Sequence, residues 1–355
     1  MIGPGLRTGL PRYGDQVDPL TALRRIAFLL ERRLEPSYRV KAFRSAADVV
    51  VRTGSASIAE RSGNGSLQEL PGIGAVTAKV ISQALDGQVP DYLARLEAES
   101  GELVELDAAG TELLQALRGD LHSHSDWSDG GSPIQEMAVT SIELGHRYQA
   151  LTDHSPRLTV ARGLTAERLR NQLEVLAGLS SRLGDFKLLS GIEVDILEDG
   201  SLDQTPELLG VLDVVVASVH SKLAMDSAAM TRRMIKAVQD PHTDILGHCT
   251  GRLLGGKKRG QSHFDARAVL GACAASQVAV EINCRPERLD PPKELLRLAV
   301  ESGCLFSIDT DAHAPGQLDW QPYGCARAVE CGVPTDRVVN TWPVDRLLEW
   351  TTRAR

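Results

Sequence analysis

Two patterns of apolar and polar residues divide the chain near residue 119. Before about residue 100, apolar residues recur at the three- to four-residue spacing of amphipathic helices. From Gly119 onward, short apolar runs alternate with longer helical patterns, which is typical of a parallel β/α domain. The pattern therefore predicts an all-α domain over residues 1–100, a linker or connecting helix over 101–118, and an α/β domain over 119–355.

The same pattern predicts where individual elements begin and end. Residues 1–15 are rich in Gly, Pro and Arg, and we expect a mobile lead-in there. Helices are predicted at 19–34, 40–51 with a continuation through 57–60, within 67–85, and near 90–99. Strands are predicted at 119–122, 148–152, 187–195, 211–219, 244–247, 278–283 and 304–308. Further helices are predicted at 133–145, 165–183, 226–239, 265–275, 292–302 and 314–331, and a closing helix at 343–355. Strands that alternate with helices in this way predict a parallel α/β barrel or sheet.

Composition places the chain among ordinary globular proteins. It has 355 residues, 42% of them hydrophobic and 24% charged, which allows about two domains. The chain has no apolar run near the roughly 18 residues that a membrane span needs, and its first residues lack the apolar region of a signal peptide. The six cysteines show no metal-binding or redox spacing, so we expect buried free thiols in a reducing cytoplasm.

Charge is unevenly distributed along the chain. The net charge is −8, whereas residues 1–100 hold 13 Lys/Arg and 11 Asp/Glu, a balance of +2 that leaves −10 for the remainder. Residues 24–61 alone contain nine basic and four acidic residues. This stretch predicts a local basic patch in the helical domain.

The segment 120–130, which reads DLHSHSDWSDG, contains the first candidate chemistry. His122 and His124 lie two residues apart at a predicted strand end, so their side chains share one face. Asp129 follows five residues after His124 in a polar turn. Two imidazoles and a carboxylate are suitable ligands for Zn²⁺, Mn²⁺ or Fe²⁺.

The same residue types recur at the ends of later predicted strands. Six of the seven strand ends carry His, Asp or Glu, and six of the nine histidines fall there. The carboxyl ends of strands in a parallel barrel face one mouth, so we expect these side chains to converge. The downstream candidates are His154, Glu193, His220, His248, Asp311 and His313. The other histidines, His146, His242 and His263, are expected in surface positions or loops.

These segments together resemble the PHP (polymerase and histidinol phosphatase) family. The motifs DLHSHSDWSDG, TDHS, GIEVDI, SVHS, ILGH and TDAH follow the family order over residues 119–313. The resemblance implies a distorted seven-stranded (β/α) barrel with three divalent metal ions, Zn, Mn or Fe. One ion would be held by His122, His124, Glu193 and Asp311. A second would share Glu193 with His220 and His248. The third would be held by Asp129, His154 and His313.

A site of this kind favours phosphate substrates. Three dications bring about +6 and three carboxylates −3, which leaves a positive site despite the acidic domain. We expect in-line attack on phosphorus by metal-bound hydroxide, because paired metals activate water and stabilise the leaving oxygen. The chain contains neither a Gly-x-Ser-x-Gly elbow nor a Walker loop that would indicate another chemistry. The catalytic residues are predicted to be Glu193, His220, Asp311 and Arg252. Phosphate contacts are predicted from Lys222, Arg252, Arg285 and Arg288.

Within the family, the chain looks closest to the PHP domain of bacterial family X DNA polymerases. The segments that carry this resemblance are TGR at 250–252, NCRPERLD at 283–290, and the helical domain. There, LPGIG at 70–74 followed by AVTAKVISQAL resembles a helix-hairpin-helix, whose backbone N–H groups hold a DNA phosphate. DNA contacts are predicted from Gly72, Gly74, Lys79, Arg39, Lys41 and Arg44.

Two departures from that family limit the expected activities. Only about 18 residues separate the helical domain from the barrel, so a polymerase core does not fit there. The position that resembles the family's Schiff-base lysine holds Val80, with Lys79 beside it, so we do not expect a lyase.

The sequence is compatible with three functions. The leading hypothesis is a metal-dependent DNA 3′–5′ exonuclease that acts in repair, with cleavage at abasic sites or removal of 3′-phosphates as related activities. The alternative is a small-molecule phosphatase of the histidinol-phosphatase type. The third is a DNA-binding scaffold with a structural metal cluster, which the complete ligand set disfavours.

Overall fold

The computed structural model describes residues 17–353 except residue 257, and the predicted lead-in over residues 1–15 lies outside this range. The described chain forms two compact units, one ending at Glu102 and the other beginning at Leu103. Each unit has its own hydrophobic core.

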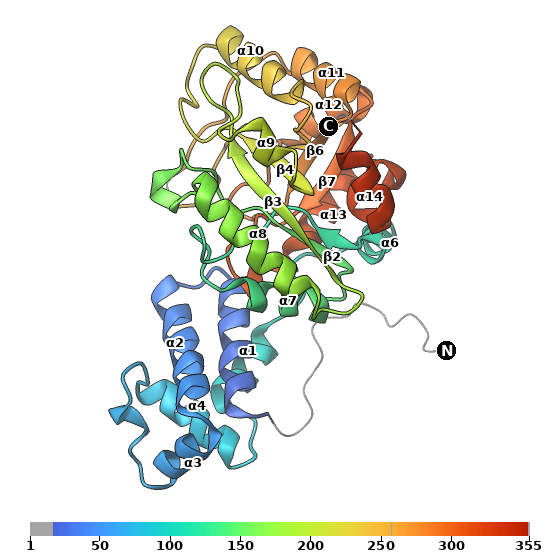
Figure 1. The fold of residues 1–355 in the computed structure, drawn as a ribbon. Helices are drawn as coiled ribbons and strands as arrows, with labels where there is room; N and C mark the ends of the chain where they lie inside the picture. Colours follow the sequence, from blue (N-terminus) through green and yellow to red (C-terminus); the bar gives the residue numbers. More distant parts are fainter. Residues whose placement is uncertain (1–16, 257, 354–355) are drawn as a thin grey trace. The chain divides into compact units, whose positions relative to one another are not determined.

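The first unit is all-α, as the pattern predicts (Figure 1). Its core is formed by apolar residues that recur at helical spacing, such as Leu23, Ile26 and Leu30. The carboxylate of Asp18 caps the first helix by accepting hydrogen bonds from the backbone N–H groups of Leu20 and Thr21. The helices are α1 (Pro19–Arg32), α2 (Ser37–Thr53), α3 (Ser55–Gly63), α4 (Ala75–Leu85) and α5 (Asp91–Glu99).

A tight turn at residues 70–74 joins α3 and a short 3₁₀ turn (Leu67–Glu69) to α4. Gly72 has a φ of +100°, and a Cβ there would lie 3.1 Å from Cγ2 of Val49. The N–H of Gly74, at the start of α4, donates to Oγ1 of Thr77 at 2.9 Å. The turn therefore needs glycine at 72, both for its conformation and for the close approach of α2. The helix-hairpin-helix expected from LPGIG is present.

The second unit contains seven parallel strands in sequential order, so the seven-stranded barrel prediction is confirmed. Ser123 pairs with Ala312 in a parallel bridge, which brings the two edges of the sheet together and nearly closes the barrel. The first, fourth and fifth strands are shorter than predicted. The strands are β1 (Gly119–Asp120), β2 (Tyr148–Leu151), β3 (Lys187–Asp195), β4 (Val214–Ser218), β5 (Ile245–Leu246), β6 (Ala279–Asn283) and β7 (Leu305–Asp309).

Helices surround this sheet (Figure 1). The connecting segment contains α6 (Ala108–Ala116), and Leu113 and Leu117 pack into the barrel core. The remaining helices are α7 (Ile134–Glu143), α8 (Ala166–Ser180), α9 (Pro206–Leu209), α10 (Ser227–Val238), α11 (Ala266–Ser276), α12 (Lys293–Glu301), α13 (Gln321–Glu330) and α14 (Val344–Thr351). Short 3₁₀ turns occupy Thr159–Ala161, Pro315–Trp320, Thr335–Arg337 and Val339–Thr341. The short helix α9 had no counterpart in the sequence prediction.

The interior of the barrel changes character along its length. Near the starts of the strands, Val214 and Ala279 belong to an apolar cluster with Trp342 and Trp350 of the C-terminal segment, which closes that end. Two residues further along β4, Val216 still belongs to this apolar cluster, whereas the corresponding position on β6 is the buried Glu281. The interior thus becomes polar at Glu281, towards the carboxyl ends of the strands.

Two further expectations concern the chain as a whole. The six cysteines are buried and free, as predicted. None of the helices in the described part of the chain has the length and apolarity needed to cross a membrane.

Candidate metal centre

His122 and His124 lie just beyond β1, on either side of the Ser123–Ala312 bridge. This extended backbone directs both side chains to one face, as the two-residue spacing predicts. The N–H of His124 donates to the carbonyl of Ala312 at 2.8 Å, which fixes the segment against the end of β7. Both imidazoles are fully buried.

Glu193, near the end of β3, is the centre of the cluster and is buried. Five histidines place a ring nitrogen close to its carboxylate. Its Oε1 lies 2.7 Å from Nε2 of His248 and 3.2 Å from Nε2 of His220. Its Oε2 is surrounded by Nδ1 of His154 at 2.8 Å, Nε2 of His122 at 3.4 Å and Nε2 of His124 at 3.6 Å. One carboxylate therefore faces ligands from four other strand ends.

Asp129 and His313 are the more exposed members of the cluster, whereas Asp311 is buried. Oδ1 of Asp311 is 3.3 Å from Nε2 of His124. Oδ1 of Asp129 is 3.3 Å from Nε2 of His313 and 3.5 Å from Nε2 of His154. The side chain of Asp129 is 36% exposed, whereas that of Glu193 is 0% exposed. Solvent thus reaches the cluster from the Asp129 side.

All nine predicted ligand residues come together at this mouth. Seven of them form three groups, and within each group one ligand atom from every residue lies within 4.8 Å of the others. They are His122 with His124 and Glu193; His154 with Glu193 and His220; and His124 with Asp129, His154 and His313. Since these groups share His124, His154 and Glu193, the division of ligands among individual ions stays a prediction.

The donor atoms fit metal binding. Within the described residues, both ring nitrogens of His124 and of His220, and Oε2 of Glu193, are buried without a hydrogen bond. Buried polar atoms are otherwise almost always bonded, so such a group of them in one place needs a partner. Imidazole nitrogens and carboxylate oxygens are ligands for zinc, manganese and iron alike.

The electrostatics favour the metal-binding forms of Glu193 and His124, whereas nearby carboxylates outweigh burial and raise the pKa of His122 and of His220, so a metal ion would have to displace a proton from each of these two. Burial alone would raise the pKa of Glu193, but the neighbouring His220, His122 and His154 hold it well below its usual value. Burial, together with the charges of His313 and His154, lowers the pKa of His124 to about 3. Near neutral pH, Glu193 is therefore a carboxylate and His124 has a free lone pair.

Glu281, in the middle of β6, supports the ligands but was not identified from the sequence. It is fully buried, and its Oε1 lies 2.6 Å from Nδ1 of His122. Its Oε2 accepts from the backbone N–H of His248 at 2.5 Å and from Nδ2 of Asn283 at 3.2 Å. A histidine that ligates metal usually donates its second ring N–H to such a carboxylate. The sequence did contain a signal for Glu281: it is a glutamate within an apolar strand, VAVEIN, just as Glu193 is in GIEVD.

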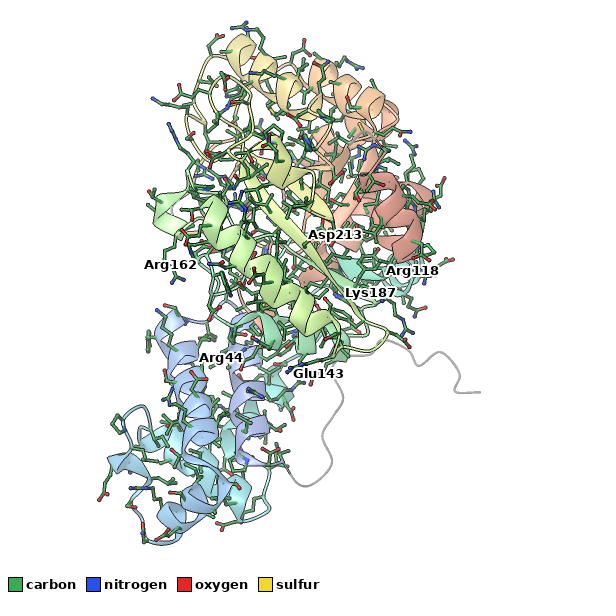
Figure 2. All side chains as sticks on the ribbon, viewed as in Figure 1. Arg44, Arg118, Glu143, Arg162, Lys187 and Asp213 are labelled. Carbon is green, nitrogen blue, oxygen red and sulfur yellow. The ribbon has the colours of Figure 1, made fainter. Side chains whose placement is uncertain are left out.

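The turn that carries Asp129 is fixed by other buried groups. The carboxylate of Asp153 accepts hydrogen bonds from Oγ of Ser125 at 2.6 Å and from Oγ of Ser128 at 2.5 Å. Arg162 donates to the carbonyls of Asp126 and Ser128, and Arg168 donates to that of Trp127. Figure 2 shows Arg162 beside the start of α8, well away from Lys187 at the start of β3. Asp153, Arg162 and Arg168 were also missed, because their role depends on the loop conformation.

The four basic residues predicted to contact phosphate differ in position. Nε of Arg288 lies 3.2 Å from Oδ2 of Asp311, and Nη1 of Arg285 lies 3.1 Å from Nδ1 of His313, so both reach the cluster. Arg252 instead donates to the carbonyls of Arg288 and Leu289. Lys222 is exposed two residues after His220. The predicted phosphate contact of Arg252 would require its guanidinium to leave those carbonyls.

The predicted DNA contacts of the first unit also differ in availability. Arg44 forms a two-bond ion pair with Glu31, at 2.9 and 2.8 Å, and Arg39 donates to the Tyr92 hydroxyl at 2.7 Å. Lys79 pairs with Asp91 at 2.8 Å but keeps its side chain 66% exposed. Lys41 is exposed. These contacts leave Lys41 and Lys79 as the more accessible of the four.

Val80, His146 and His242 do not belong to the candidate metal centre. Val80 is 1% exposed in the helical core, where a charged lysine would be costly to bury. His146 lies in a loop but is buried, and His242 pairs with Asp240 at 2.9 Å. His146 therefore lies in a loop, as expected, but it is buried and not at the surface.

Comparison with protein families gives two matches. Residues 120–283 match the PHP domain, and residues 16–89 match a helix-hairpin-helix domain. The two matched segments correspond to the barrel and to the helical unit.

Two named proteins and one solved structure are similar to parts of this chain. The DNA polymerase/3′-5′ exonuclease PolX of Bacillus subtilis (strain 168) is 39% identical over 244 residues, which is 68% of this chain and 42% of that protein. The chain thus aligns with less than half of that relative. A probable phosphatase of Thermoanaerobacter sp. (strain X514) is 27% identical over 62% of this chain and 89% of its own length. Among solved structures, histidinol phosphate phosphatase of Lactococcus lactis, complexed with zinc, histidinol and phosphate, has a TM-score of 0.42 at 17% identity, covering 61% of this chain and 94% of that one.

Proposed function

The barrel of this chain is a PHP domain that follows a helix-hairpin-helix domain, and from this premise we propose that the chain is a DNA exonuclease that works from the 3′ end. Its general activity is metal-dependent hydrolysis of phosphate esters. The convergence of the nine predicted ligand side chains on one barrel mouth supports the proposal. Cleavage at abasic sites and removal of 3′-phosphates would use the same chemistry.

The residues of the mouth suggest how a phosphodiester would be held. Bound divalent ions would supply Lewis-acid polarisation of the phosphate and activation of water. We infer three such ions, with Glu193 shared between two of them. Arg288, beside Asp311, is positioned to contact a phosphate oxygen through its guanidinium. The buried walls around Glu193 keep bulk water from screening these charges.

The direct test uses the full-length protein loaded with manganese or zinc. A single-stranded DNA labelled at its 5′ end should shorten stepwise to a ladder of labelled products. Glu193→Ala should abolish the ladder, because it removes the carboxylate that faces five histidines. Stepwise loss of the 5′ label, or no change in the DNA, would contradict the proposal.

We assign DNA anchoring to the amino end of α4, where backbone N–H groups point away from the helix. Val76 lies in the first turn of α4 and is 54% exposed, so Val76→Glu places a negative charge there without disturbing the core. Val51→Glu on α2, at 56% exposure, is the matched control. Weaker DNA binding is expected for Val76→Glu alone. Equal binding by both variants would refute the anchoring role.

A small-molecule phosphatase is the second candidate. It is favoured by the alignment with probable phosphatases over most of their length and by the net charge of −10 after residue 100. Turnover of histidinol phosphate, with DNA left intact under the same metal conditions, would favour this candidate over the first.

A further inference from the structure

The loop between β5 and α11, residues 247–265, is unusually long. Such connections commonly have about 2–6 residues, and much longer ones are usually functional. The loop begins beside the candidate ligand His248 and then turns back on itself. Leu253 and Arg259 exchange two backbone hydrogen bonds, at 3.0 and 3.1 Å, which brings the described residues 253–256 and 258–259 together in a small hairpin, here called the 253–259 hairpin.

The charge of this loop is opposite to that of its domain. Residues 247–264 contain four basic residues and no acidic one, whereas the chain after residue 100 carries −10. On the hairpin, Lys258 and Arg259 are exposed. Leu254, four residues before Lys258, is 46% exposed. The hairpin therefore offers cationic groups and an apolar side chain to solvent.

The hairpin is fixed next to the loop that reaches the metal ligands. The N–H of Leu254 donates to the carbonyl of Glu287 at 2.6 Å, and Nε of Arg252 donates to the carbonyl of Arg288 at 3.0 Å. At its base, Oγ1 of Thr250 donates to the buried carboxylate of Asp290 at 2.6 Å. These bonds place the hairpin at the edge of the mouth, on the side of His248.

The guanidinium of Arg288, in the neighbouring loop, is only partly paired, since its Nε lies 3.2 Å from Oδ2 of Asp311. Nη1 of Arg288 is buried without a hydrogen bond among the described residues. Nε of Arg259 donates to the carbonyl of Gly251 at 2.7 Å, while the residue itself stays exposed. A guanidinium has five N–H donors, so Arg259 keeps donors for an anion. A chain of phosphates that extends along the hairpin would supply that anion.

We propose that the 253–259 hairpin binds the retained DNA strand next to the scissile linkage, with Lys258 and Arg259 on its phosphates and Leu254 against a sugar or base. This inference rests on the proposed nuclease function and deepens it. A strand that is shortened from its 3′ end continues from the reacting phosphate in the 5′ direction, and the hairpin binds that part. A small phosphate monoester has no such extension, so the hairpin makes the enzyme prefer a polynucleotide strand.

The test compares two substrates in the metal-loaded, full-length protein. One is a single-stranded 12-mer, and the other is thymidine 5′-(p-nitrophenyl) phosphate, which has no neighbouring nucleotide. The double variant Lys258→Ala, Arg259→Ala should lower the ratio of kcat/KM on the 12-mer to that on the small ester about tenfold or more, since two phosphate contacts are lost. Lys293→Ala, on α12 and paired with Glu330, is the control and should leave the ratio unchanged.

A binding measurement makes the test independent of the folding of one variant. With a phosphorothioate 12-mer as probe, Lys258→Ala alone should reduce the slope of log Kd against log salt by about 0.7, the value for one phosphate contact on a single strand. An unchanged ratio and an unchanged slope would overturn the role of the hairpin while the nuclease activity stands. A wild-type protein that hydrolyses the small ester and not the 12-mer would overturn the nuclease function, and the hairpin inference with it.

Discussion

Replacing Glu281 with glutamine should weaken metal binding although it changes a single atom. Glu281 accepts hydrogen bonds on both oxygens, from Nδ1 of His122 on Oε1 and from the N–H of His248 on Oε2. A glutamine has one accepting oxygen and one NH₂ group. Whichever way the amide turns, its NH₂ faces a donor.

The size of the effect follows from these contacts. If the NH₂ faces His122, the ring loses the acceptor that keeps its proton on Nδ1 and leaves Nε2 open towards Glu193. If it faces His248, a buried backbone N–H loses its partner, which costs about 1–3 kcal/mol. Loss of a partner behind a metal ligand typically weakens metal affinity about 10- to 100-fold. We expect Glu281→Gln to fall in that range.

Competition between the protein and a chelator of known affinity measures this change for zinc or manganese. Glu294→Gln, at an exposed position in the first turn of α12, is the matched control and should bind metal as the wild type does. If Glu281→Gln binds metal within twofold of the wild type, the hydrogen bonds of Glu281 do not orient the ligands, and the reasoning is wrong.

Three further predictions test the fold and the cluster. Gly191→Ala should lower the free energy of unfolding by about 1–3 kcal/mol in a urea titration, because its Cβ would lie 2.8 Å from the carbonyl oxygen of Val214; a loss below about 0.5 kcal/mol would show that the barrel yields there. Removing metal with EDTA should lower the melting temperature. Adding manganese at 100 times its Kd should raise the free energy of unfolding again, by about 2.7 kcal/mol for each site filled. Equal melting curves with and without metal would contradict metal binding by the folded state. Arg44→Ala should cost about 3 kcal/mol, since the carboxylate of Glu31 stays buried after losing its two-bond partner; unchanged urea unfolding would show that this ion pair does not matter for stability.

The sequence predicted the barrel and its mouth because both depend on simple geometry. Side chains two residues apart share a face of a strand, which grouped His122 with His124. Parallel strands end at one mouth, which brought His220 and His248 to Glu193 from different parts of the chain. These arguments need only the order and the approximate ends of the strands.

The direction of long side chains in loops and between helices was less predictable. Arg252 lies four residues after His248, yet its guanidinium is bound by carbonyls of the next loop. Arg44 lies in a basic segment, but its partner Glu31 comes from the neighbouring helix. Such contacts depend on tertiary packing, which residue spacing does not encode.

Metal content is the most direct test of the account. The full-length protein, saturated with manganese or zinc and then freed of unbound ions, should retain about three ions per chain by elemental analysis. Glu193→Ala should retain markedly fewer, because this carboxylate faces ring nitrogens of five histidines. A wild-type protein that retains no ions, or a variant that retains as many as the wild type, would contradict the claim that these side chains form the metal centre.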